Sequence, residues 1–200
     1  MKKQLIAMAV AAAAACAQAA TVNVYGALDT GLTYTHQHGA DSLEMHSGSY
    51  AGPRFGLRGG EDLGGGFKVK YILEAGFADD SGLSGKEGSL FNRETQLSIE
   101  SPYGTLGFGR FGAFTSGSSS MSWYWDMEPF ETGYNHAGTQ ATMNNIWSLH
   151  SNSIYYVSPV FKGAKLGLQY GLSGDEDKEA ARWGDRNHWL NAAVRWDAAT

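Results

Sequence analysis

The sequence predicts an all-β fold, an antiparallel transmembrane β-barrel of which this chain contains about eight strands. Three observations support this fold class. Apolar and polar residues alternate with period two over most of the chain. The connections between the alternating segments are short and long in turn, and aromatic residues recur at the segment ends. Strands of about ten residues, joined in this way, are typical of outer-membrane barrels.

Residues 1–19 have the layout of a secretory signal peptide. Lys2 and Lys3 form a basic start, an apolar run covers residues 5–15, and Ala17-Gln-Ala fits a cleavage site after Ala19. The run is too short for a membrane anchor. Cys16 also allows a lipoprotein signal, although the residues before it are alanines. Since Cys16 is the only cysteine, residues 20–200 offer no disulfide, thiolate metal site or cysteine nucleophile.

Eight segments alternate in the manner of strands. In residues 67–77, Val69, Tyr71 and Leu73 share one face, and the opposite face carries Lys68 and Lys70. The other clear segments are 22–34, 164–172 and 190–196, and the weaker ones are 54–61, 92–100, 105–111 and 145–157. In a barrel the polar face points into a water-filled lumen, so we predict that the lumen-facing residues include Tyr25, Asp29, Lys68 and Lys70.

The lengths of the connections distinguish a barrel from a soluble β-sandwich, whose strands would also show alternating apolar and polar residues. The short connections are 62–66, 101–104 and 158–163, and the long ones are 36–52, 78–89, 112–144 and 173–185. This regular change between short and long loops favours the barrel, as do the aromatic residues at strand ends. The sandwich stays open as the alternative.

Composition excludes several classes of function. The chain has 15 basic and 20 acidic residues, which argues against nucleic acid as a partner. No stretch of residues 20–200 approaches 18 uninterrupted apolar residues, so we predict no transmembrane helix. A role in the membrane therefore requires a closed barrel, in which every backbone group is paired.

Two glycine-rich stretches could each form either a phosphate-binding loop or a turn. Gly64-Gly-Gly is followed by a predicted strand, and the G-x-G-x-x-G match at residues 107–112 is followed by a serine-rich segment without helical periodicity. We therefore predict a turn at 62–66 and no bound nucleotide or other cofactor. A metal site at His36, His38 and His46 is conceivable, but solvated loop histidines are the simpler interpretation.

Six motifs resemble the general porins of Gram-negative bacteria, and the β-proteobacterial type in particular. They are VNVYGALDTG from residue 22, RFGLRGGEDLGGG from 54, LEAGF from 73, LFNRE from 90, YGTLGFGR from 103 and NSIYYVSP from 152. The resemblance implies a trimeric barrel in the outer membrane with an expected sixteen strands. Residues 20–200 would then be its N-terminal half, and we expect the chain to be a fragment.

The resemblance also implies a pore constriction. In such porins the third long loop folds into the lumen and faces a ladder of arginines, and here the corresponding loop is residues 112–144. Its predicted acids are Asp126, Glu128 and Glu131. The matching wall residues are Arg54, Glu74 and Arg93. Arg93 has the parity of the apolar face, so its side chain needs a bulge or a position above the apolar band.

The implied function is a water-filled channel for passive diffusion of small hydrophilic solutes and ions. The implied partners are outer-membrane lipids and two further copies of the chain in a homotrimer. Since the acidic loop faces a thinned basic wall, with Ala27 and His150 at two positions where relatives carry basic residues, we predict a mild preference for cations. The alternative is a small eight-stranded barrel with a structural or adhesin role. An enzyme would need a nucleophile and base on one strand face, which the sequence does not reveal, so we predict no catalytic activity.

Overall fold

The computed structural model describes residues 21–48, 51–117, 119–123, 149–172 and 188–197. Ten strands lie in these ranges, and eight of them form one sheet in the order β1-β4-β5-β6-β7-β8-β9-β10. The strands are β1 (Thr21–Ala27), β2 (Thr30–Gln37), β3 (Ala40–Ser47), β4 (Arg54–Gly64), β5 (Phe67–Gly76), β6 (Glu94–Ser101), β7 (Gly104–Gly112), β8 (Leu149–Val157), β9 (Ala164–Gly171) and β10 (Trp189–Trp196).

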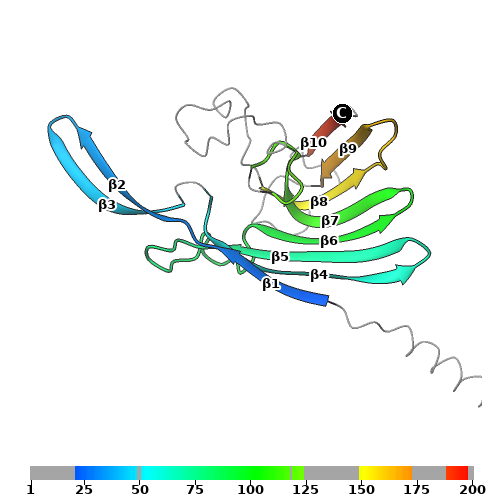
Figure 1. Cartoon of the computed structure of the whole chain (residues 1–200), viewed down its shortest axis with the longest axis horizontal. Coiled ribbons are helices and arrows are strands. Elements are labelled where there is room, and N and C mark those ends of the chain that lie inside the picture. The colour runs from blue at the N-terminus through cyan, green and yellow to red at the C-terminus, as the bar shows by residue number, and fades with distance from the viewer. Residues whose placement is uncertain (1–20, 49–50, 118, 124–148, 173–187, 198–200) are drawn as a thin grey trace, which may run out of the picture.

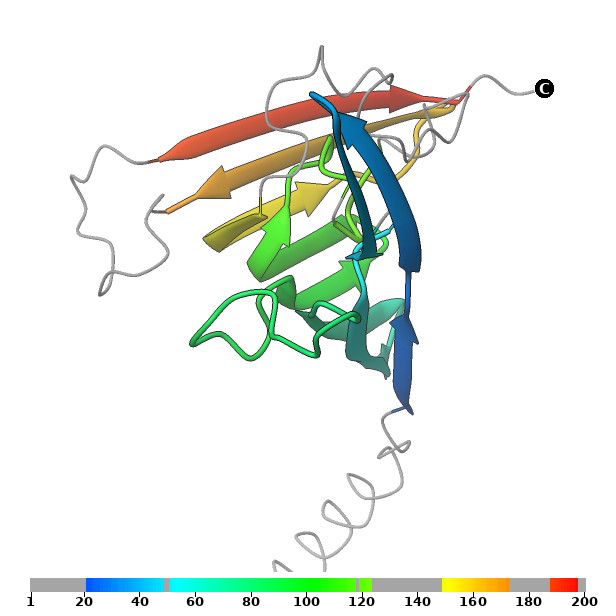
Figure 2. The ribbon, with the colours of Figure 1, turned by 90° about the vertical axis from the view of Figure 1, so that its left-hand side faces the viewer.

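The large sheet is strongly curved and open at two edges. Each pair of neighbouring strands in it is antiparallel. Figure 1 shows these strands side by side, and Figure 2 shows the sheet bending from β10 round to β1 like part of the wall of a cylinder. Because β1 and β10 are the first and last strands of the sheet, the described residues do not close into a small eight-stranded barrel. In this part of the chain no helix is long and apolar enough to cross a membrane.

The two faces of the sheet differ in the way that period-two alternation predicts. On β6, Leu97 and Ile99 point outward and are exposed, whereas Gln96 and Ser98 point inward and are buried. The register continues this division across the sheet, since Leu97 lies opposite Tyr71 of β5 and Phe108 of β7. An apolar outer face and a polar inner face are the arrangement expected of a barrel wall in a membrane.

The predicted strand 22–34 and the predicted long loop 36–52 are wrong. The chain leaves the sheet after β1, and β2 pairs with β3 in a hairpin that projects away from the sheet (Figure 1). The break lies at Asp29, whose Oδ2 accepts the Ala51 N–H at 2.5 Å and whose own N–H donates to Asp79 Oδ2 at 2.8 Å. The Asp29 N–H, which a continuous strand could donate to a neighbouring strand, is thus bonded to a side chain instead.

The hairpin closes with two residues at positive φ, His38 at 52° and Gly39 at 81°. Two-residue loops of this kind match the right-handed twist of paired strands. Near the tip, His36 Nδ1 lies 2.5 Å from Asp41 Oδ1, so this histidine has a carboxylate partner. Within the described ranges no group of three or more His, Cys, Asp or Glu residues could hold a metal ion.

The predicted turn at residues 62–66 does connect two strands, but β4 continues to Gly64, so the turn itself is Gly65-Gly66. Gly64, Gly65 and Gly66 all have positive φ, between 62° and 82°. Asp62 Oδ1 accepts the Gly64 N–H at 2.9 Å, and the β4–β5 register shifts between these two residues. Only glycine adopts this conformation at low cost, and here three consecutive residues require it.

Candidate functional site: the inner wall and its loop

The inner wall contains a row of side chains that crosses four strands. By register, Tyr25 of β1 lies opposite Gly56, Gly56 lies opposite Glu74, and Glu74 lies opposite Glu94. The Tyr25 ring passes over Gly56, because a Cβ there would lie 2.8 Å from the Tyr25 Cζ and hydroxyl atoms. The Tyr25 hydroxyl can therefore reach β5, where it donates to Glu74 Oε2 at 2.9 Å.

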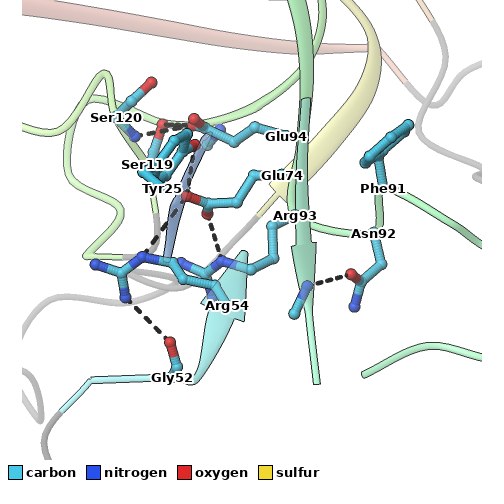
Figure 3. Close-up of polar contacts among 12 residues, drawn as sticks. Tyr25, Gly52, Arg54, Glu74, Phe91, Asn92, Arg93, Glu94, Ser119 and Ser120 are labelled. Atoms are coloured by element: carbon cyan, nitrogen blue, oxygen red, sulfur yellow. Dashed lines mark hydrogen bonds and ion pairs between the residues drawn. The ribbon is translucent and has the colours of Figure 1, made fainter. Parts of the chain in front are cut away.

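Glu74 holds two arginines as well as this tyrosine (Figure 3). Arg93 Nε lies 2.5 Å from Glu74 Oε1, and Arg54 Nε lies 3.6 Å from Glu74 Oε2. Arg54 also donates to the Gly52 carbonyl at 3.0 Å. The Glu74 residue is 6% exposed, so its charge depends on these partners. One carboxylate is shared by two guanidinium groups, which leaves this cluster with one net positive charge.

Arg93 reaches the inner side because it lies before the strand. β6 begins at Glu94, and the Arg93 N–H donates to the Glu74 carbonyl at 3.1 Å. The preceding Asn92 accepts the Gly76 N–H at 2.7 Å, which continues the contact with β5. Arg93 therefore reaches the inner face in spite of its odd parity. It does so from a position beyond the end of the strand, and not through a bulge.

The first part of the long loop after β7 lies against the inner wall. Phe114 is 1% exposed, and its ring stacks on Trp123 with centroids 4.5 Å apart. Both rings sit over Gly167 of β9, where an added Cβ would come within 2.5 Å of Phe114 and 2.8 Å of Trp123. Gln169 accepts the Phe114 N–H at 3.2 Å and donates to the Gly112 carbonyl at 3.1 Å. The loop thus passes β8 and is fixed to β9.

A second set of contacts fixes the same loop to β6. Glu94 is 1% exposed, and its Oε1 accepts the Ser119 hydroxyl at 2.8 Å and the Ser120 N–H at 2.9 Å. Gln96 also donates to the Ser120 hydroxyl at 2.9 Å. Sequence reasoning did not select Glu94. The sequence feature that could have identified Glu94 is its position in the alternating series with Gln96 and Ser98, on the inner face that the serine-rich loop contacts.

Comparison with known proteins identifies the family. The family model for Gram-negative porins matches residues 5–195. The chain belongs to this family. It is 32% identical over 199 residues to an outer membrane porin protein of Bordetella pertussis, covering 90% of this chain and 50% of that relative. It is also 32% identical over 205 residues to outer membrane porin protein 32 of Delftia acidovorans, covering 98% of this chain and 56% of that relative.

A solved structure shares the fold of this porin. The anion-selective porin from Comamonas acidovorans superposes with a TM-score of 0.69 at 23% sequence identity, over 90% of this chain and 54% of that one. The chain therefore spans about half the length of the relatives it matches. Porins of this family belong to the outer membrane of Gram-negative bacteria, which is where this porin is located, and they are channels rather than enzymes.

The remaining predicted site residues of this porin have different outcomes. Lys70 pairs with Glu100 at 2.6 Å, and Lys68 lies 3.8 Å from Asp62, both on the inner face. The prediction that Asp29 faces the lumen is wrong, because this residue lies in the break between β1 and β2 and not on a strand. The predicted loop acids (Asp126, Glu128 and Glu131) and the signal peptide, residues 1–19, lie outside the described residues.

Proposed function

We propose that this porin forms a water-filled channel through which small hydrophilic solutes and ions diffuse passively across the outer membrane. The observation that supports the proposal most is the division of the curved sheet into two faces. Its outer face exposes side chains such as Val24 at 76% and Val194 at 71%, whereas its inner face carries amides, hydroxyls and charges. Exposed apolar strands suit lipid, and a polar concave wall suits a solvated lumen.

The proposed constriction lies where the long loop faces Arg54, Glu74 and Arg93. The Glu74 carboxylate and the two guanidinium groups supply charge of both signs at one level of the wall. We propose that Asp126, Glu128 and Glu131 face this cluster from the loop and that the pore has a mild preference for cations. Rings of charged side chains at a narrow point are a common basis of ion preference in channels.

We further propose that the whole protein is a homotrimer embedded in outer-membrane lipids. The exposed apolar outer face requires a cover, and lipid tails and neighbouring subunits are the covers that a barrel in a membrane provides. Chemical cross-linking of the protein in native outer membranes tests the trimer, with a ladder ending at three subunits as the expected result. A pattern that ends at one subunit would contradict it.

Single-channel recording tests the channel itself. The intact protein, extracted from outer membranes and reconstituted in a planar bilayer, should give discrete conductance steps that rise with salt concentration. Absence of steps from correctly folded protein would refute the channel. Reversal potentials in a KCl gradient then test the constriction with Glu74→Gln and the matched control Glu100→Gln. Loss of one charge ~7 Å from the ion path in water is worth about 0.6 kcal/mol, or roughly threefold for each ion. Because the change acts in opposite directions on K⁺ and Cl⁻, Glu74→Gln should shift their permeability ratio towards chloride by about sevenfold.

A further inference from the structure

The large sheet ends in two unpaired edges. β1 is its first strand and β10 its last, and no other strand in the described part of the chain pairs with the outer side of either. The N–H and C=O groups along such an edge need hydrogen-bond partners, and lipid offers none. In a membrane both edges must therefore pair with another strand.

The two edges of one chain do not pair with each other, because the loop after β7 takes up too much room. An eight-stranded barrel is just wide enough for its own side chains. Here the inner side of the wall also holds loop backbone, since the Phe114 N–H donates to Gln169 and the Ser120 N–H donates to Glu94. The sheet therefore has the curvature of a wider barrel, whose wall needs more than these eight strands.

The curved sheet corresponds to about half of a complete barrel wall (Figure 2). Most of this chain superposes on about half of the solved porin from Comamonas acidovorans. A wall that follows half of a barrel turns through about half a circle, so a second copy, rotated about an axis along the lumen, completes the circle. Head-to-tail contacts close into a ring when the rotation between copies has this property.

The strand directions at the two edges are compatible with such a ring. Every pair of neighbouring strands in the sheet is antiparallel, so the first and the last of its eight strands run in opposite directions. After the rotation, β10 of one copy lies antiparallel to β1 of the other. This is the pairing that a membrane barrel requires, and an odd number of strands would have excluded it.

The faces and the lengths of the edge strands also match. Val24 of β1 and Val194 of β10 both point outward and are exposed, whereas Tyr25 points inward to Glu74. β1 has seven residues and β10 has eight, so the contact uses nearly the whole of each strand. An apolar outer face and a polar inner face thus continue across the contact without a change of phase.

We propose that two copies of this 200-residue chain close one barrel of sixteen strands, twice the eight of one sheet, in which β10 of each copy pairs with β1 of the other. All four edges are then paired, which satisfies the backbone in lipid. These two seams differ from the contacts of a homotrimer, in which complete barrels lie side by side. They are also independent of the proposed channel, because they depend on the edges and not on what passes through the lumen.

Disulfides introduced across the seam test the proposal. Every variant carries Cys16→Ser, so that only introduced cysteines react. Val24→Cys is combined with Leu190→Cys, Ala192→Cys or Val194→Cys, which all lie on the outer face. The full chain is refolded in detergent micelles and oxidised. We expect a covalent dimer on a denaturing gel without reductant at one of these three positions, because facing outward residues of paired strands lie within disulfide reach.

The size of the product distinguishes the possible architectures. A ring of two copies gives a covalent dimer and nothing larger. An internally linked monomer would show a self-closed barrel, and a ladder of larger products would show open-ended association, so either would overturn the proposal. Native mass spectrometry of the wild-type chain should give the mass of two copies, and the mass of one copy or of three would likewise contradict it.

A matched control makes the cross-link specific to the seam. Leu97→Cys replaces the β10 cysteine, since Leu97 is also exposed on the outer face but belongs to β6, in the middle of the sheet. This pair lies beyond disulfide reach in the ring and should give less than about a tenth as much dimer. Equal amounts of dimer from the control and from the best β10 position, or no product at any β10 position, would refute the seam. Because no current is measured, a closed ring that does not conduct would refute the channel alone.

Discussion

Replacing Glu94 should release the beginning of the long loop from the inner wall. The Glu94 carboxylate is buried and accepts hydrogen bonds from the Ser119 hydroxyl and the Ser120 backbone N–H. The second of these joins the loop backbone directly to β6. Glu94→Ala removes both, and Glu94→Gln keeps one acceptor oxygen but loses the charge.

The size of the effect follows from these two contacts. A hydrogen bond to a charged group is worth about 1.5–3 kcal/mol, so two of them contribute about 3–6 kcal/mol to the docking of the loop. Burial of the carboxylate costs part of this, and removing the charge relieves that cost. We therefore expect Glu94→Ala to weaken docking by about 3 kcal/mol and Glu94→Gln by about 1.5 kcal/mol. Because 1.4 kcal/mol is a factor of ten, the released population should rise roughly a hundredfold and tenfold respectively.

Hydrogen exchange measured by mass spectrometry on the detergent-solubilised protein gives this population. Peptides that cover residues 113–123 should lose protection by the factors above, while peptides from β9 and β10 stay unchanged. Glu100→Gln is the matched control, since it removes a carboxylate from the same strand and face without touching the loop. Equal loss of loop protection in Glu94→Ala and Glu100→Gln would show that Glu94 does not hold the loop.

Three other changes give independent tests. Gly56→Ala places a Cβ 2.7 Å from the Leu73 carbonyl oxygen and 2.8 Å from the Tyr25 ring, and should destabilise the fold by about 1–3 kcal/mol through overpacking. Thermal unfolding measures this loss, and Tyr25→Ala in the same background should restore only the part that the ring causes. Phe114→Ala should cost about 3–5 kcal/mol of loop docking and speed cleavage of the loop by chymotrypsin, so an unchanged digestion rate would argue against the packing. The hydrogen bond from His36 lowers the pKa of Asp41 below its ordinary 3.8, so the ionised Asp41 carboxylate should accept this bond above about pH 4 and lose it as the pH falls through the lowered value. NMR titration of the Asp41 carboxyl carbon measures this pKa, and an unchanged value in His36→Ala would refute the assignment.

The alternation of residue types predicted the strands of the large sheet well, because period two reports directly which side chains share a face. It could not show the break between β1 and β2, since alternation continues through residues 22–34 without a change of phase. The break is set by hydrogen bonds from the Ala51 N–H to Asp29 and from the Asp29 N–H to Asp79, between residues far apart in the chain. Contacts of this kind leave no periodic signal.

The site was predictable to a similar degree. The family resemblance selected Arg54, Glu74 and Arg93, parity agreed only for Arg54 and Glu74, and the structure brings all three together. Alternation assigns a residue to a face but does not identify its neighbours, so the burial of Glu94 beneath the loop could not be predicted. Pairing is equally hidden, since Glu100 lies opposite Lys68 in the register yet binds Lys70.

The attachment of one loop to both β6 and β9 has a mechanical consequence. Glu94 holds the loop at β6 and Gln169 holds it at β9, so the loop spans the concave side of two intervening strands like the chord of an arc. Backbone ladders allow neighbouring strands to hinge, but a chord of fixed length resists a change in the curvature between its ends. The curvature of the wall and the position of the loop therefore change together. A lateral force that flattens this part of the wall must either move the loop as well or break the contacts at one of its two ends.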